Sequence, residues 1–376
     1  MSFQFIKKNI ARNLVNFSGW QTKRKIIVIE SDDWGSIRMP SIAAFEKLIK
    51  SGIRIDKDPY GKFDSLESPD DLSELFSVLQ KHSDRNCNNP ILTANSVVAN
   101  PDFEMIKKNN FKYYYYKSFK DTYSDFTHTK DSFTVFQQGI QQKLVIPQFH
   151  GREHLNIKLW LEQLRLGNEH ILKAFELGMW GLNTKLISAS KINIQASFDA
   201  LFEEEIEKHK LIIKEGLDLF KITFGFQAKS FIANNYIWDS RLNKTLYDNG
   251  IEYIQGMKYQ ITPILNNKNR TMIRHKIGEK NEFGQVYLIR NCVFEPSIYQ
   301  NVDSVKSCLC DIHNAFFWNK PAIISTHRIN FIGSLIRANR ENNLVLFNSL
   351  LSKILEKWPD VEFMSSDQLG REINSH

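Results

Sequence analysis

The length, composition and charge of this chain narrow the range of proteins it can be. A chain of 376 residues suffices for one large α/β domain or two ordinary ones. A composition of 42% hydrophobic and 24% charged residues, with only 17 Gly and 10 Pro, excludes a collagen-like or largely disordered protein. The net charge of +7 is compatible with anionic partners. No nucleic-acid-binding motif accompanies this charge, and we expect the protein to bind no nucleic acid.

The cysteines and the N-terminal stretch bear on location. The four cysteines form neither a dense disulfide framework nor a CxxC pair, which favours a reducing compartment. Residues 1–20 contain no uninterrupted apolar stretch of signal-peptide length, and no later segment approaches the length of a membrane span. We therefore expect a cytoplasmic protein.

The N-terminal stretch has the pattern of an amphipathic helix. Its apolar residues recur at helical spacing, while Lys7, Lys8 and Arg12 decorate the other face; the apolar residues are Phe3, Ile6, Ile10, Leu14 and Phe17. Peripheral contact with a membrane surface is one interpretation, and a helix that caps its own domain is the favoured one. The predicted organisation is a helix over residues 1–20 followed by one domain over 21–376.

Short β-branched runs bounded by polar residues recur along that domain and read as buried strands. They span residues 25–30, 91–95, 144–149, 229–233, 252–255, 285–289, 322–325 and 361–364. Helical patterns lie between most of them, so the sequence predicts an α/β fold built as a distorted (β/α) barrel of seven or eight strands. Irregular stretches at 56–88, 117–143 and 258–284 are expected to be loop insertions, and residues 113–116 a short strand.

Two adjacent carboxylates follow the first predicted strand. That strand ends in Ser31-Asp32-Asp33-Trp34-Gly35, at the carboxyl edge where such folds carry their chemistry. Adjacent residues on an extended segment point to different sides. One carboxylate can therefore bind a metal ion while its neighbour accepts a proton, although such a pair can also serve in turns and helix caps.

A pair of histidines follows the predicted strand at 144–149. His150 and His154 are four positions apart, and a helix is expected to begin here, so that both imidazoles share one helix face and converge on an ion. The same segment also matches the inverted zinc-peptidase motif H-x-x-E-H, in which Glu153 activates water. That second reading needs a further carboxylate ligand, for which the acidic run at 203–207 is a candidate.

A third histidine ends an apolar strand. Ala322-Ile323-Ile324-Ser325-Thr326 leads directly into His327, a location suited to a general acid. A lone histidine there is more often structural, and the adjacent Arg328 is expected to lower its pKa. Convergence with the other two segments favours the catalytic reading.

In these three segments the chain resembles the polysaccharide deacetylases of carbohydrate esterase family four. Asp32-Asp33 is similar to the family's first motif, the paired histidines to its second, and Thr326-His327 to its terminal motif, in family order. The resemblance implies a distorted (β/α) barrel that removes acetyl groups from an N- or O-acetylated sugar. It also implies that Asp33, His150 and His154 bind one divalent metal, with zinc expected first and cobalt, nickel or iron as alternatives. Asp32 would then act as the base and His327 as the acid.

The chain also departs from the family pattern. The arginine of the family's third motif is missing from the comparable segment at 230–238, and Arg38 and Arg290 are candidates to replace it or to contact substrate. The usual fourth motif has no clear counterpart, although Glu295 ends a strand in a comparable position. Gly151 stands where the family has serine or threonine.

Substrate contacts are expected from residues beside these segments. Aromatic rings stack on sugar faces, and Trp34 and Tyr236 are the favoured candidates, together with Arg38, Arg290 and Glu295. The predicted partner is an acetylated carbohydrate. Two alternatives remain open at this point, which are the inverted-motif zinc peptidase and a catalytically silent member of the deacetylase family that binds glycans.

Overall fold

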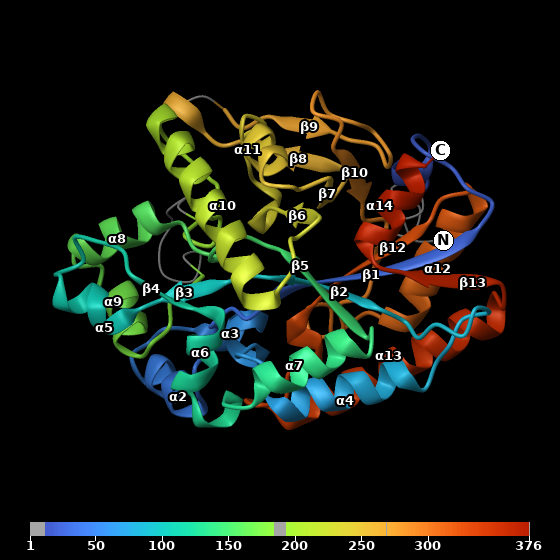
Figure 1. Ribbon diagram of the computed structural model, residues 1–376. Coiled ribbons are helices and arrows are strands. Elements are labelled where there is room, and N and C mark those ends of the chain that lie inside the picture. Colours follow the sequence, from blue (N-terminus) through green and yellow to red (C-terminus); the bar gives the residue numbers. More distant parts are fainter. Residues whose placement is uncertain (1–11, 184–192, 268, 376) are drawn as a thin grey trace.

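A nine-stranded parallel sheet forms the centre of the fold (Figure 1). The structure is a computed structural model and describes residues 12–183, 193–267 and 269–375. Along the sheet the strand order is β10-β7-β6-β5-β2-β1-β12-β11, and β13 pairs with the first half of β1. The strands are β1 (Lys25–Trp34), β2 (Leu92–Ser96), β5 (Val145–Phe149), β6 (Ser230–Ile232), β7 (Tyr253–Gly256), β10 (Val286–Ile289), β11 (Cys292–Val293), β12 (Ala322–His327) and β13 (Val361–Met364).

Strand β1 occupies the middle of this sheet because it is apolar on both faces. Ile27 and Ile29 belong to one hydrophobic cluster, and Ile26 and Val28 belong to another. Side chains alternate along a strand, so Glu30 and the residue two further on continue the Ile26 side. The charged side chains of Glu30 and Asp32 therefore lie on the same side of the sheet as the apolar side chains of Ile26 and Val28.

Helices cover both apolar clusters. The first cluster packs under α4, α7, α12 and α13, three of which lie together along one side of the molecule, and the second packs under α10, α11 and α14 (Figure 1). The helices are α2 (Ile42–Lys50), α3 (Pro59–Phe63), α4 (Pro69–Gln80), α5 (Phe103–Lys108), α6 (Phe119–Asp125), α7 (Ser132–Gln141), α8 (Ile157–Arg165), α9 (Glu169–Glu176), α10 (Glu203–Phe224), α11 (Leu242–Asp248), α12 (Ser304–Phe317), α13 (Arg337–Lys357) and α14 (Ser366–Asn374). Two antiparallel pairs are added, β3 (Ala99–Pro101) with β4 (Tyr116–Ser118) and β8 (Tyr259–Ile261) with β9 (Met272–Arg274).

The predicted class, an α/β fold with a large parallel sheet, is confirmed, and all eight predicted strands are present. The ninth, β11, has only two residues, too few to give a pattern. The sheet ends at β10 and β11, which follow one another in the chain and are not hydrogen-bonded to each other in the described part. This unpaired seam agrees with the predicted distortion of the barrel.

Two expectations about the connecting segments are wrong. The stretches at 56–88 and 117–143 are not irregular, since they contain α4 and α7. Helix α4 is announced by a capping box, in which Ser68 and Asp71 bond each other's backbone N–H groups, and this signal was overlooked. The predicted strand at 113–116 is also wrong, because only its last residue belongs to β4.

Most of the predicted N-terminal helix lies outside the described residues, including Lys7 and Lys8. Within the described part, residues 12–16 are helical. No helix among the described residues combines the length and the apolar character that crossing a bilayer requires. Membrane-surface contact and a cytoplasmic location stay predictions from the sequence.

Candidate metal centre and active site

Both carboxylates at the end of β1 face one cavity. Asp32 and Asp33 line a cavity of about 400 Å3 at the carboxyl edge of the sheet. The pairing of β1 with β2 shifts register between Ser31 and Trp34, and Asp33 has a left-handed backbone with φ of 78°. A non-glycine residue in that conformation is strained, and such strain concentrates at functional sites. Here it turns two neighbouring side chains into the same cavity, where they meet different partners.

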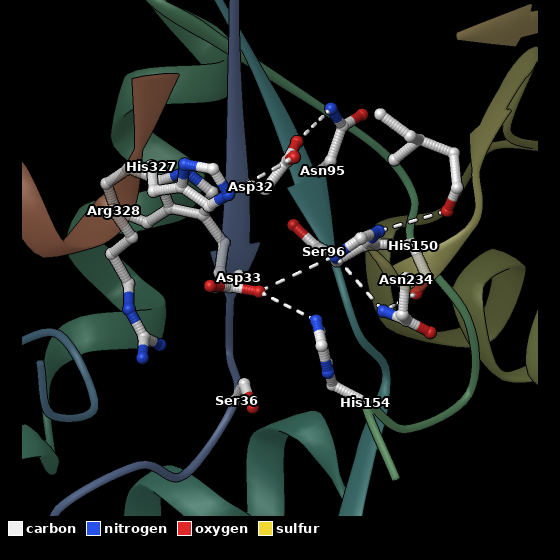
Figure 2. Close-up of polar contacts among 12 residues, drawn as sticks. Asp32, Asp33, Ser36, Asn95, Ser96, His150, His154, Asn234, His327 and Arg328 are labelled. Atoms are coloured by element: carbon white, nitrogen blue, oxygen red, sulfur yellow. Dashed lines mark hydrogen bonds and ion pairs between the residues drawn. The ribbon is translucent and has the colours of Figure 1, made fainter. Parts of the chain in front are cut away.

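Asp33, His150 and His154 form a buried cluster that fits a divalent metal ion (Figure 2). The Asp33 Oδ1 atom lies 3.5 Å from His150 Nε2 and 3.3 Å from His154 Nε2, and the ligand atoms of the three residues lie within 4.8 Å of one another. No hydrogen-bond donor among the described residues satisfies this buried Oδ1 atom. An unsatisfied carboxylate oxygen facing two imidazole nitrogens is the donor set of catalytic zinc and of related metals.

A backbone contact on the side away from Asp33 fixes the orientation of the His150 imidazole. Its Nδ1 atom lies 3.0 Å from the backbone oxygen of Ile232 at the end of β6, so that Nδ1 carries the proton and Nε2 faces Asp33. Metal-binding histidines are oriented by such contacts. The amide of Asn234 lies 3.1 Å from the same Nε2 atom and was not foreseen from the sequence.

The two histidines converge through a loop and not through a helix, so the expected helix start at this motif is wrong. Helix α8 begins only at Ile157, and His150 N–H bonds the backbone oxygen of Ser96 on the neighbouring strand. Gly151 has a φ of 103°, and a Cβ atom there would lie 3.3 Å from the Asn234 side chain. The turn therefore favours glycine at this position, because other residues rarely adopt a positive φ.

The Glu153 side chain points away from the cluster of Asp33, His150 and His154, which disfavours the inverted peptidase motif. Its carboxylate is buried, bonds Arg152 at 2.7 Å and does not line the cavity. In the acidic run, Glu203 pairs with Arg241, and Glu205 pairs with Lys158. The described residues therefore place neither the water-activating glutamate nor the extra carboxylate ligand at this centre.

Asp32 is held by an arginine and an amide. Arg290 Nη2 donates to Asp32 Oδ1 at 2.6 Å and Nη1 to Oδ2 at 2.7 Å, while Asn95 Nδ2 donates to Oδ1 at 2.7 Å. Burial alone would raise the pKa of Asp32, but the charge and hydrogen bonds of Arg290 outweigh it and hold that pKa below its usual value. Asp32 is consequently an ionised acceptor.

Of the two arginines that the sequence offered for holding Asp32, Arg290 is the one that bonds it. Its side chain has no exposed surface and also bonds Glu30 at 2.6 Å. Arg290 does not line the catalytic cavity, and its guanidinium lies between two carboxylates, so its contact with substrate stays a prediction from the sequence. Asn95 was overlooked, although a polar residue near the end of a buried strand was the available signal.

His327 lies beside Asp32 because β1 and β12 pair in register at these two residues. Its Nε2 atom is 3.8 Å from Asp32 Oδ2, and its Nδ1 atom is 2.6 Å from Glu295 Oε1. Burial lowers the pKa of His327, but the carboxylates of Glu295, Asp32 and Asp33 outweigh this and raise it to about 9. His327 is thus a charged donor in the protein without metal.

The expectation that Arg328 lowers the pKa of His327 is wrong. Figure 2 shows the Arg328 side chain directed away from the imidazole, and its guanidinium binds Asp64 and Glu67. Glu295 is the charged group that faces His327, and its second oxygen accepts from Asn330 at 2.7 Å. Its place next to the histidine indicates an orienting role.

The remaining candidates divide between cavity and core. Arg38 lines the cavity, where its Nη2 atom lies 3.1 Å from Asp33 Oδ2 and its guanidinium lies between the rings of Tyr60 and Trp180. Tyr236 also lines the cavity. No sequence signal marked Tyr60 or Trp180.

The prediction for Trp34 is wrong. The residue is buried in the hydrophobic core, donates from Nε1 to Ser31 at 3.0 Å and packs against Phe136. Its ring does not line the cavity. The register shift of β1 that brings Asp33 into the cavity leaves the next side chain on the opposite face.

Known proteins are similar to this chain in structure, not in sequence. No protein-family model and no curated protein sequence matches it. Among solved structures, a protein described as a polysaccharide deacetylase from Mycobacterium smegmatis has a TM-score of 0.44 and 9% identity, covering 95% of this chain and 93% of its own. PuuE allantoinase has a TM-score of 0.47 and 10% identity, covering 95% and 92%.

A 4-α-glucanotransferase from Thermococcus litoralis has a TM-score of 0.44 and 10% identity over 92% of this chain, which spans only 40% of that enzyme. All three TM-scores are below 0.5. The structural neighbours of this chain include polysaccharide deacetylases of carbohydrate esterase family four and an allantoinase, matched across most of the chain at low identity.

Proposed function

We propose that this protein hydrolyses acetyl groups from an N- or O-acetylated sugar or glycan intermediate and uses one divalent metal ion. The carrying observation is that one cavity contains both the Asp33, His150 and His154 cluster and the pair Asp32 and His327. Separate groups for metal binding, proton acceptance and proton donation are what hydrolysis of an unactivated amide or ester requires.

Asp33, His150 and His154 would hold the metal. Two imidazole nitrogens and one carboxylate oxygen suit zinc best, and cobalt, nickel or iron share this preference. When bound with open positions, such an ion supplies Lewis acidity for the acetyl carbonyl and for water. Arg38, on the other oxygen of Asp33, would keep that carboxylate binding through Oδ1 alone.

The protons are moved by the chain's own residues. Asp32 is kept ionised by Arg290 and accepts a proton from the attacking water. His327, charged through Glu295, donates a proton to the nitrogen or oxygen that leaves the acetyl group. The 3.8 Å separation of the two side chains allows the proton on Asp32 to return to His327 after acetate departs. Water and the acetylated sugar thus yield acetate and the free amine or alcohol.

Substrate contacts are assigned to the cavity wall. We propose that Tyr236 and Arg38 contact the sugar, since both line the cavity and a ring or a guanidinium can pack on a sugar face. Glu295 and Arg290 are proposed as positioning residues for His327 and Asp32. The stretch from β6 into the 3-10 turn Asn234–Tyr236 brings Tyr236 to this wall.

The test is acetate release by metal-loaded protein from a panel of N-acetylated and O-acetylated sugars, measured beside the metal content. Asp32→Asn is expected to keep one metal ion per chain and to lose about 10²- to 10⁴-fold in kcat, the usual contribution of a general base. Stoichiometric metal with no acetate from any substrate would favour the silent glycan-binding alternative. Turnover that survives Asp32→Asn would contradict the proposed roles.

A further inference from the structure

A second cavity adjoins the first. It has a volume of about 410 Å3 and shares four wall residues with the catalytic cavity, namely Met257, Val293, Glu295 and Tyr299. It lies at the seam where β10 and β11 are not hydrogen-bonded to each other. The shared residues place the two cavities side by side, and the proposed deacetylation does not itself require the second one.

Apolar and polar residues both line the second cavity, but its polar side chains already have partners: Arg12 pairs with Asp311, and Asn291 bonds Asn16. Val15, Met257, Val293, Tyr299 and Val302 contribute to its walls. Tyr299 is 54% exposed and Val302 is 45% exposed, so these two wall residues present accessible apolar surface at the second cavity. Exposed apolar surface in a concave site is typical of ligand-binding sites.

The position of His327 decides which part of a substrate would reach this cavity. A general acid must contact the departing nitrogen or oxygen, so the sugar lies on the His327 side of the acetyl carbonyl. Glu295 holds His327 and borders both cavities. The second cavity therefore continues from the sugar and not from the acetyl group.

Size and chemistry point to the ligand. A cavity of about 400 Å3 is already at the scale of a small-molecule site and accommodates one sugar ring with its acetyl group. A second sugar would need polar partners for its hydroxyls, whereas Arg12, Asp311 and Lys258 on these walls are already bonded within the protein. We propose that the second cavity binds an apolar aglycone, an alkyl or aryl group carried by the acetylated sugar. This inference rests on the proposed deacetylation for its orientation.

The first test compares two N-acetylglucosaminides that differ only in their aglycone, methyl and octyl. Burying the alkyl chain is expected to raise kcat/KM for the octyl glycoside at least about tenfold. Val302→Glu places a charge on the wall of the second cavity and should bring the octyl-to-methyl ratio close to one. Val302→Trp, which fills space without adding charge, should do the same. The matched control is Val345→Glu on α13, where Val345 is 68% exposed and lines neither cavity.

The second test separates failure of this inference from failure of the proposed reaction. Octyl β-glucoside, which carries no acetyl group, is titrated below its micellar concentration onto protein with and without metal. Binding that Val302→Glu weakens at least tenfold and that Val345→Glu leaves unchanged supports the apolar site even when no sugar is deacetylated. Binding that is insensitive to Val302, together with equal kcat/KM for the two glycosides, would overturn the inference. An N-octanoyl sugar provides the opposite outcome. If octanoate is released from it faster than acetate from the N-acetyl sugar, with the same dependence on Val302, the inference is overturned, because the alkyl group would then lie on the acyl side.

Discussion

Arg290, which follows β10 near one end of the sheet, donates two hydrogen bonds across the interior to Asp32 on β1, at 2.6 and 2.7 Å. The two residues are 258 positions apart in the chain. Their contact brings the residue after β10 into the candidate active site and gives the proposed base a fixed orientation and a lowered pKa.

Arg290→Lys tests this contact. Lysine keeps the positive charge but cannot bond both carboxylate oxygens, so Asp32 loses orientation while the buried charge stays balanced. We expect kcat to fall about 10- to 100-fold with metal content unchanged. Steady-state kinetics and metal analysis of the same preparations measure both quantities. A wild-type kcat in this variant would show that the two-point contact is dispensable.

Substitution of a metal ligand should lower the metal content of the protein, whereas substitution of a proton-transfer residue should not. Asp33→Ala, His150→Ala and His154→Ala are each expected to lower bound metal from one ion per chain to well below one, because a three-residue site loses a donor. The control is His313→Ala, which removes an exposed histidine on α12. Elemental analysis after gel filtration gives the ratio. Full metal content in all three alanine variants would place the ion elsewhere.

Glu295→Gln should change the titration of His327. The Glu295 carboxylate favours the charged imidazole, so its neutralisation lowers the pKa of His327 from about 9. NMR titration of metal-free protein checks this shift directly. In loaded protein the alkaline limb of kcat/KM should move to lower pH, since His327 must be protonated to act as the acid. An unchanged alkaline limb would mean that a different group donates the proton.

Glu153→Gln distinguishes the deacetylase from the inverted-motif peptidase. Glu153 bonds Arg152 outside the cavity, so we expect acetate release and metal content within about twofold of the wild type. Some loss of stability, about 1 to 3 kcal/mol, is expected from weakening a buried ion pair whose arginine keeps Glu215 as a partner. Chemical denaturation measures that loss. Abolished turnover with intact folding would favour Glu153 as the activating base.

His209 predicts a pH dependence of stability. Burial lowers its pKa from 6.5 to about 4, so protonation favours the unfolded chain. Its contribution is fully present above pH 6.5 and is lost as the pH falls toward 4, by up to about 1.4 kcal/mol per pH unit. His209→Leu should therefore reduce the slope of unfolding free energy between pH 6.5 and 4. His313→Leu, at an exposed position, should leave the slope unchanged.

Local patterns in the sequence were sufficient for the strands and for the residue types of the site. Apolar runs such as those of β1 and β12 are buried whatever the rest of the chain does, because each is too hydrophobic to remain at the surface. Polar groups directly after such runs must then lie at the carboxyl edge. This reasoning identified Asp32, Asp33 and His327 without knowledge of the fold.

Direction and pairing of side chains were not accessible in this way. The loop conformation of the histidine motif depends on a left-handed glycine and on a contact with β2, and spacing alone had suggested a helix. Trp34 follows the left-handed Asp33 and therefore packs in the core, against the expectation for a strand-end aromatic. Helix α4 was missed although Leu72, Leu75, Phe76 and Leu79 recur at helical spacing and bury one apolar face.

The sequence by itself determined which chemical groups arrive at the carboxyl edge of a parallel sheet, since burial of apolar strands is a local property. Only the tertiary structure decided that Arg290 serves Asp32, that Glu295 serves His327, and that Arg328 turns to Asp64 and Glu67. These ion pairs join residues from different strands and loops, and charges select partners by distance and desolvation, neither of which is defined before the chain has folded.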